Sequence, residues 1–315
     1  MTTGPAVDYR ERMRGCAEAI ELGAPAIVVP ADHVVMLGDL QFHYLDWGNA
    51  HLPHLILLHG GGLTAHTWDM AALLLLDRYH LVALDLRGHG DTDWTPDEHI
   101  HDDLNDLMYG DVQLFLDHLG YERVSLAGMS LGGVAAIRYA AEHPVGVEAL
   151  VMVDVGPESM REAGQATQAF HRETDILERF EDFLDRAVKF NPLRKREHIE
   201  YSLTHSLKET PEGWTWKQDP RPRDNGALVP ETERIASSER RAAELWTAVR
   251  AITAPTLVLR GEHSRGLAPD VAERLVQEMK DAHLVTVAGA TGYIPGDRPK
   301  DFAREVDAFL SALPR

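Results

Sequence analysis

The chain contains the stretch Val124-Ser125-Leu126-Ala127-Gly128-Met129-Ser130-Leu131-Gly132-Gly133, which reads as a strand, a tight turn and the start of a helix. Val124–Ala127 is a run that is apolar except at Ser125, as in a strand buried on both faces, and Ser130 to His143 has the apolar spacing of a helix. Small residues beside Ser130 let the backbone turn sharply beneath it. We therefore expect a G-x-S-x-G turn that presents Ser130 as a nucleophile. The alternative is a glycine-rich connection with an incidental serine.

Further short apolar runs lie on either side of this stretch, and helical patterns separate most of them. Gly38–Asp39 is a hairpin signal between the first two runs. The alternation predicts an α/β fold with a mostly parallel eight-stranded sheet, helices on both faces and ligands at the carboxyl ends of the strands. The other strands are expected at Val34–Met36, Leu40–Trp47, Leu55–Leu58, Leu81–Leu84, Leu150–Val153, Pro255–Arg260 and Leu284–Val287. The other helices are expected at Asp102–Leu119, Pro269–Lys280 and Asp301–Leu313, with Asp102 as a cap and Gly120 as a stop.

One region breaks this rhythm. Residues 157–251 are rich in charge, histidine and tryptophan and contain no buried-strand run, which predicts a mostly helical cap inserted into the sheet domain. The expected organisation is therefore an N-terminal extension over residues 1–32, a core over 33–156 and 252–315, and the cap.

Composition excludes several classes of function. The 315 residues include 31 basic and 50 acidic ones, a formal net charge of −19 that disfavours nucleic acid and anionic membranes as partners. No apolar run reaches the ~18 residues of a membrane span, and the single cysteine, Cys16, rules out an intrachain disulfide. We expect a cytoplasmic protein whose partner is a small-molecule substrate; a homodimer is compatible with this interpretation.

A second glycine-rich segment, His59-Gly60-Gly61-Gly62, follows the run Leu55–Leu58. Without side chains, its backbone N–H groups can approach a ligand oxygen. We expect the N–H of Gly61 and the N–H of Leu131 to form an oxyanion hole. The other interpretation is a turn that only needs the freedom of glycine, and for His59 we favour packing and hydrogen bonding.

Taken together, the motifs resemble the α/β-hydrolase fold superfamily, in particular its capped esterases, lactonases and C–C hydrolases. The resemblance covers about residues 33–313 in the correct order, and its motifs are specific for the fold rather than for a substrate. It implies a triad with Ser130 as nucleophile and needs no cofactor. The segments that carry it are His59–Gly62, Leu84–Asp91, Gly128–Gly133, Asp154–Pro157, Pro255–Gly261 and Val287–Pro299.

The resemblance also assigns the acid. The family most often places it in a G-x-x-D turn after the penultimate strand, but here that turn reads Gly261-Glu262-His263-Ser264. The family's other position, after the strand that precedes the cap, holds Asp154. We expect Asp154 to be the acid; the alternative is an aspartate that caps the following turn.

The histidine of the triad is missing. The family pattern G-A-G-H corresponds here to Gly289-Ala290-Thr291-Gly292-Tyr293, so Gly292 occupies the position of the base, and no histidine follows His283. Three interpretations compete: an engineered or natural variant of a serine hydrolase that has lost its base; a ligand-binding protein, or one with non-hydrolytic chemistry; or a substitute histidine, with His263 the leading candidate. For His263 itself, a solvent-facing loop histidine is the favoured interpretation.

The expected activity is hydrolysis of an ester or lactone of a small to medium apolar molecule through an acyl-enzyme. We expect its turnover to be very low because Gly292 stands at the position of the base. The alternatives are a binding protein or sensor and a C–C bond hydrolase. The pattern His99-Ile100-His101-Asp102-Asp103 is interpreted as a solvated helix start, and no metal site is predicted. Arg87 and Asp91 are expected to hold their loop rather than bind substrate. Candidate pocket residues are Gly60, Met129, Trp214, Trp216 and Tyr293, although packing within the cap explains the tryptophans equally well.

Overall fold

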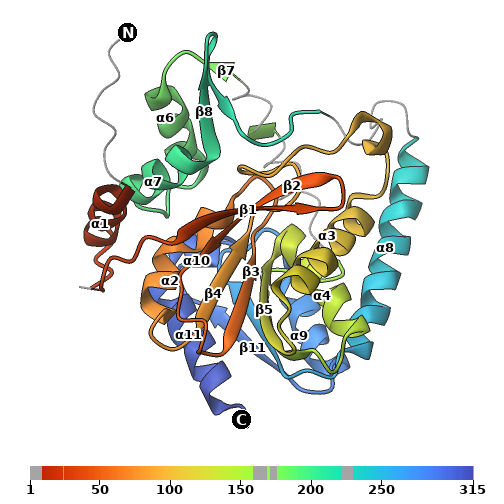
Figure 1. The fold of residues 1–315 in the computed structure, drawn as a ribbon. Helices are drawn as coiled ribbons and strands as arrows, with labels where there is room; N and C mark the ends of the chain where they lie inside the picture. The colour runs from red at the N-terminus through yellow and green to blue at the C-terminus, as the bar shows by residue number, and fades with distance from the viewer. Residues whose placement is uncertain (1–8, 24, 159–168, 171–175, 222–229, 315) are drawn as a thin grey trace.

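The computed structural model describes residues 9–23, 25–158, 169–170, 176–221 and 230–314. Within them, eight strands form one sheet in the order β1-β2-β4-β3-β5-β6-β10-β11 (Figure 1). This confirms the predicted mostly parallel eight-stranded sheet. The strands are β1 (Ala31–Leu37), β2 (Leu40–Asp46), β3 (His54–Leu58), β4 (His80–Leu84), β5 (Val124–Met129), β6 (Val147–Val153), β10 (Thr256–Gly261) and β11 (Ala282–Val287).

Within this eight-stranded sheet, β2 is antiparallel to both of its neighbours. It pairs with β1 through the predicted hairpin, where Leu37 opposes Leu40, and with β4 on its other side. The pairs from β4 to β11 are all parallel. Their carboxyl ends therefore meet at one edge of the sheet, where a ligand site is expected in an open α/β sheet.

The central strands β3 to β6 are almost entirely buried because helices cover both faces of the sheet. In β3, Ile56 and Leu58 pack in one core cluster, while Leu55 and Leu57 pack in the other. This division is the alternation of side chains along a strand. One face is covered by α3 (Leu104–Leu119), α4 (Ser130–Glu142), α8 (Glu231–Ala251) and α9 (Pro269–Glu278). The other is covered by α2 (Asp69–Leu75), α10 (Ile294–Asp297) and α11 (Pro299–Ala312), and α1 (Tyr9–Ala19) packs against α2 in the same core cluster.

The start of α3 differs from the prediction by one residue. Asp103, not Asp102, is the cap, and its carboxylate accepts a hydrogen bond of 2.8 Å from the amide of Asn105. Asp102 instead pairs with the exposed His99 at 2.8 Å, next to the short 3-10 helix η2 (Asp97–His99). Gly120 ends the helix at φ 67°, as expected for a left-handed C-cap.

The cap is not purely helical. It contains α6 (Phe180–Phe190) and α7 (Arg196–Ser206), but also an antiparallel sheet with strands in the order β7-β9-β8. These strands are β7 (Ile176–Leu177), β8 (Leu207–Thr210) and β9 (Gly213–Trp216). They escaped prediction because they are short and their exposed faces carry polar residues. The small core of the cap includes Phe183, Leu203 and Trp216.

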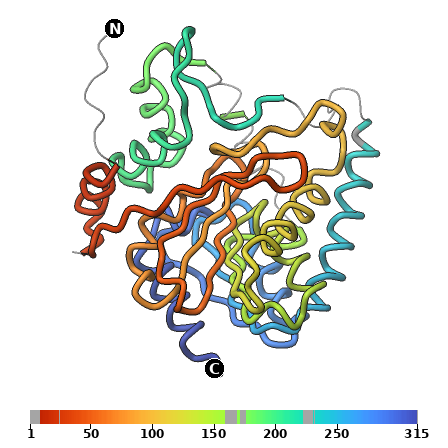
Figure 2. The backbone as a smooth tube through the Cα atoms, viewed as in Figure 1, coloured from red at the N-terminus to blue at the C-terminus, as the bar shows by residue number. Residues whose placement is uncertain are grey.

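Two helices from the predicted cap and N-terminal extension, α8 and α1, pack against helices outside their own segments. Helix α8 lies along α4, with Trp246 and Val249 in the core of the sheet domain, so its packing favours counting it with the core (Figure 1). Helix α1 lies beside α7, as the tube view also shows (Figure 2). The domain boundaries remain a prediction. Among the described helices, none combines the length and the apolar character needed to cross a membrane.

Candidate active site

Ser130 lies at the junction of β5 and α4, in a backbone conformation that few non-glycine residues adopt. Its φ is +47°, and its side chain is exposed. The turn is tight: a Cβ atom on Gly128 would lie 2.6 Å from the Cα of Gly133, and one on Gly133 would lie 2.6 Å from Cγ1 of Val155. The small residues of the G-x-S-x-G pattern are thus required by close approach, and the strained serine points out of the packed turn.

The glycine segment after β3 lies directly beside this turn. The amide of Gly132 donates a hydrogen bond of 3.1 Å to the carbonyl of His59. A Cβ on Gly60 would lie 3.3 Å from Cβ of Ser130, and one on Gly61 would lie 3.7 Å from a side-chain methyl of Leu131. The two residues predicted to supply oxyanion-hole donors, Gly61 and Leu131, are therefore neighbours, on the same side of the turn as Gly60.

His59 has a structural role, as the sequence analysis favoured. It is fully buried, and burial lowers its pKa, so the ring is neutral. Its Nδ1 donates to the carbonyl of Gly60 at 2.7 Å, and its Nε2 accepts from the amide of Leu86 at 3.0 Å. Both ring nitrogens are thus used to join the loops after β3 and β4.

Asp154, the predicted acid, follows β6 and has a left-handed backbone at φ 48°. Its Oδ2 accepts a hydrogen bond of 2.7 Å from the hydroxyl of Ser264, and its Oδ1 accepts one of 3.3 Å from the amide of Gly261. Burial raises the pKa of the Asp154 carboxyl to about 6, although these hydrogen bonds and the Arg260 guanidinium oppose the shift. Histidine is absent from the described groups that act on this carboxylate.

Gly292 lies directly against Asp154. A Cβ atom on Gly292 would lie 2.3 Å from Oδ2 of Asp154 and 3.0 Å from its Cγ. The φ of Gly292 lies outside the left-handed region, so its backbone accepts other residues, unlike Gly289 at φ 65°. The structure thus has a carboxylate oxygen at the point where a side chain on residue 292 would begin.

The remaining candidate histidines lie elsewhere. The His263 side chain is 53% exposed and 3.8 Å from the Glu262 carboxylate, which agrees with the favoured interpretation as a solvent-facing loop residue. His283 is opposite Leu257 at the amino-terminal part of the β10–β11 pair, as expected. The structure therefore pairs neither residue with Asp154.

The predicted pocket residues separate into different environments. Met129 is buried beneath the turn, and Trp216 packs edge-on against Phe183 in the core of the cap. Trp214 is partly exposed and lies in an edge contact with Phe180. Tyr293, one residue after Gly292, stacks under the guanidinium of Arg194 of the cap at 4.5 Å. Gly60 and Tyr293 are the two that flank the candidate triad positions.

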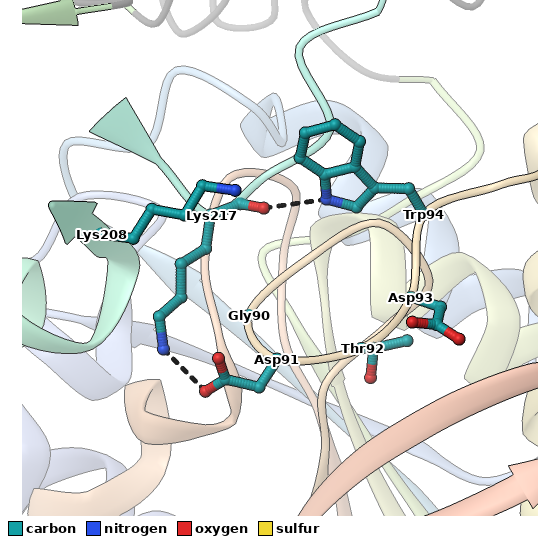
Figure 3. A pocket seen from close by; sticks show the side chains of 7 residues that line it. All are labelled: Gly90, Asp91, Thr92, Asp93, Trp94, Lys208 and Lys217. Atoms are coloured by element: carbon teal, nitrogen blue, oxygen red, sulfur yellow. Dashed lines mark hydrogen bonds and ion pairs between the residues drawn. The ribbon is translucent and has the colours of Figure 1, made fainter. Parts of the chain in front are cut away.

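The loop after β4 is bonded to helix α3 of the core on one side and to the cap on the other. Arg87 donates two hydrogen bonds, of 2.5 and 2.6 Å, to the buried carboxylate of Asp111, as expected for a residue that holds its loop. Asp91 pairs with Lys217 of the cap at 2.6 Å, and the indole N–H of Trp94 donates to the Lys217 carbonyl at 3.0 Å (Figure 3). They border a cavity of about 410 Å³ between this loop and the cap, lined by Gly90, Asp91, Thr92, Asp93, Trp94, Lys208 and Lys217.

Ser264 was missed by the sequence analysis. Its hydroxyl accepts from the amides of Gly266 and Leu267, at 3.0 Å each, and donates to Asp154. It therefore positions the acid from the turn in which the family more often places the acid itself. The available signal was a hydroxyl residue three positions after Gly261, in that same turn.

Two clusters of described residues have the composition of metal ligands. One comprises His66, Asp69 and His205, and the other His43, Asp85 and Asp91. Neither includes a residue of the candidate triad.

Comparison with known proteins places this geometry in a family. Residues 55–305 match the model of the alpha/beta hydrolase family. The chain belongs to this family. The match spans the serine turn, the glycine segment, Asp154 and Gly292, so all the candidate positions lie within it.

Several relatives of this hydrolase are esterases or lipases. The chain is 32% identical to esterase Rv0045c of Mycobacterium tuberculosis over 267 residues, which cover 81% of this chain and 82% of that one. A crystal structure of Rv0045c superimposes with a TM-score of 0.75 at 26% identity, covering 98% of this chain and all of that one. The sn-1-specific diacylglycerol lipase ABHD11 of Mus musculus is 26% identical over 279 residues, covering 86% of this chain and 85% of that one.

Proposed function

We propose that this chain is the scaffold of a serine hydrolase for an ester or lactone of a small to medium apolar molecule, with its turnover limited by Gly292. The observation that carries the proposal is the closeness of Gly292 to the Asp154 carboxylate: a Cβ atom on residue 292 would lie 2.3 Å from Oδ2. An acid orients a catalytic histidine through a direct hydrogen bond. Residue 292 is thus where a histidine held by Asp154 belongs.

The chemistry follows from the positions of the other groups. The Ser130 hydroxyl adds to the substrate carbonyl carbon, and its proton passes to a base. The oxygen that becomes negative accepts hydrogen bonds from the N–H groups of Gly61 and Leu131. The alcohol leaves with a proton from the same base, and water then hydrolyses the acyl-enzyme. Similarity to Rv0045c, named an esterase, supports this choice of substrate class.

With glycine at residue 292, this scheme has no side chain there to accept the proton. Without a base, Ser130 is an unactivated alcohol. Triad mutants in other hydrolases keep only roughly 10³–10⁴-fold acceleration over water, from binding and the oxyanion hole. We therefore expect weak ester turnover, with ligand binding intact.

The test restores the base. Gly292→His is expected to raise kcat/KM for a chromogenic acetate or butyrate ester by at least about 100-fold, the usual contribution of a general base. Gly292→Ala is the matched control, since it also forces the Asp154 carboxylate to turn aside but adds no base. Adding Ser130→Ala to Gly292→His should abolish the gain. Free imidazole should give a smaller rescue of the unmodified chain. A folded Gly292→His protein without any gain overturns the proposal.

The second candidate is a ligand-binding protein or sensor. It is favoured by the Asp154 carboxylate, which fills the start of the side-chain space at residue 292 and is held there by Ser264. Ligand-induced thermal stabilisation without rescue by Gly292→His would support it. A C–C bond hydrolase uses the same scaffold, and a β-diketone substrate in the Gly292→His assay distinguishes it from an esterase.

A further inference from the structure

Five buried or partly buried polar side chains converge away from the serine turn, where α1, the first turns after the glycine segment and the cap meet. Tyr9 comes from α1, His66 from the 3-10 helix η1 (Ala65–Trp68), and Asp69 from the start of α2. Tyr201 and His205 come from α7 of the cap. No role in the proposed hydrolysis uses any of them.

The centre of this cluster is Asp69, whose exposed fraction is 0%. Its Oδ2 accepts hydrogen bonds from the hydroxyls of Tyr201 and Tyr9, the latter at 3.0 Å, and lies 3.0 Å from Nδ1 of His66. Burial and the Asp69 carboxylate raise the pKa of both phenols, so they remain protonated donors. The other oxygen, Oδ1, is buried and has no hydrogen-bond partner among the described residues. A buried carboxylate oxygen without a partner is unfavourable.

His205 also has a buried polar atom without a hydrogen-bond partner among the described residues. Its ring stacks on that of His66, with centroids 3.7 Å apart and an interplanar angle of 22°. Its Nε2 is buried and, within the described part of the chain, also lacks a hydrogen-bond partner. A buried ring nitrogen without a partner is unfavourable, as is the buried Asp69 oxygen. A neutral imidazole offers a nitrogen lone pair to a metal ion.

We propose that His66, Asp69 and His205 bind one divalent first-row transition ion, such as Zn²⁺, Co²⁺ or Ni²⁺. A ring nitrogen of each histidine and a carboxylate oxygen of Asp69 all lie within 4.8 Å of one another. Bonds of about 2.0–2.2 Å to one ion bring such atoms to about 3–4 Å apart, so small movements suffice, chiefly a turn of the His205 ring out of its stack. Two imidazoles and one carboxylate favour these ions over Mg²⁺ or Ca²⁺.

In the second cluster with metal-ligand composition, His43, Asp85 and Asp91, the buried Asp85 carboxylate is fully hydrogen-bonded. In it, Asp85 Oδ1 accepts from the amide of Ala65 at 2.6 Å, while Oδ2 contacts Nδ1 of His43 at 2.7 Å and accepts from the amide of Asp91 at 3.0 Å. Both oxygens therefore have partners within the protein. The contrast with Asp69 points to the His66–Asp69–His205 group as the metal site.

An ion at this site would connect the cap to the core. His205 belongs to the cap, whereas His66 and Asp69 follow the glycine segment that ends at Gly62. An open cleft of about 650 Å³ between α1 and the cap is lined in part by Tyr201 and Thr204 of α7, the helix that carries His205. Binding should therefore raise the melting temperature as well as occupy the ligands.

The test measures metal binding directly on the whole chain after treatment with a chelator. Titration with Co²⁺, followed by its visible absorption, should show one saturable site per chain, and Zn²⁺ should displace the Co²⁺. His205→Phe keeps an aromatic ring against His66 but removes a ligand; it is expected to weaken Zn²⁺ affinity at least about 100-fold, since losing even an outer-shell partner costs 10–100-fold. His66→Phe should have the same effect, which guards against misfolding of one variant.

The control is His283→Ala, because the His283 side chain is 71% exposed and lies on β11, outside the cluster. It should bind Co²⁺ and Zn²⁺ like the unmodified chain. Zn²⁺ should raise the melting temperature of the unmodified chain and of His283→Ala, but not that of His205→Phe. The proposal is overturned if the unmodified chain shows no saturable site, or if folded His205→Phe and His66→Phe bind as tightly as His283→Ala. Neither outcome depends on hydrolytic activity.

Discussion

The amide of Gly132 donates a hydrogen bond of 3.1 Å to the carbonyl of His59, and this contact joins the serine turn to the glycine segment. A Cβ on Gly132 would lie 2.5 Å from that carbonyl oxygen and 2.6 Å from the carbonyl oxygen of Leu58. Because both of these oxygens belong to the backbone, rotation of a side chain cannot relieve the close contact. The spacing of the two candidate oxyanion donors therefore depends on a glycine at residue 132.

Gly132→Ala should accordingly destabilise the fold by about 1–3 kcal/mol, the usual penalty for overpacking. The matched control is Gly110→Ala. Gly110 also lies within a helix, but a Cβ there meets nothing within 4 Å. Alanine should stabilise that helix by about 0.5–1 kcal/mol, since it restricts the unfolded chain. Chemical denaturation measures both free energies of unfolding. Equal effects of the two substitutions would contradict the close approach at Gly132.

Asp154→Asn should stabilise the protein at neutral pH. The pKa of the Asp154 carboxyl is about 6 in the folded state, above its ordinary 3.8, because burial disfavours the charge. The folded state therefore holds the proton more tightly than the unfolded state, and the stability of the unmodified chain falls as the pH rises from about 4 to about 6. Asparagine does not titrate, so its advantage should grow over this window to at most about 3 kcal/mol.

Melting temperatures measured from acid to neutral pH check this prediction. Asn keeps the shorter of the two contacts, because its side-chain oxygen can accept from the Ser264 hydroxyl as Oδ2 of Asp154 does. The two proteins should converge below about pH 4. A constant difference across the whole range would show that the carboxylate is not strained by burial.

Arg87→Met should destabilise the protein by about 3–5 kcal/mol, because it leaves the buried Asp111 carboxylate without its bidentate partner. The double substitution Arg87→Met with Asp111→Leu removes both charges and should recover most of that loss. The two variants are compared by denaturation under the same conditions. If the single and double substitutions are equally destabilising, the effect of Arg87 arises from packing rather than from the uncompensated charge.

Cys16 should be almost inert in the folded protein. It is 3% exposed, and burial raises the pKa of its thiol to about 12. Since the thiolate is the reactive form, labelling with a disulfide reagent at about pH 8 should be at least about 1,000-fold slower than in denaturant. Because Cys16 is the single cysteine, one signal per chain reports it. Rapid labelling under native conditions would show that α1 separates from its neighbours.

The sheet and the serine turn were predictable from sequence because their signals are local. Val124–Ala127 is apolar except at Ser125 because both faces of β5 are covered, and the small residues after it meet the steric demands of a turn a few residues long. The strands of the cap carried no such signal, since they are short and largely outside the main core.

The other features were decided by tertiary contacts between distant parts of the chain. Asp154 is pressed against Gly292 and held by Ser264, 110 positions along the sequence, and Asp69 is joined to Tyr201 of the cap across 132 positions. No short pattern encodes such pairs, because they form only when crossovers bring strand ends and cap to the same edge. The sequence alone determined the serine, its turn and the missing histidine; the fold decided how the acid occupies the position facing that glycine, and which buried groups are left without partners.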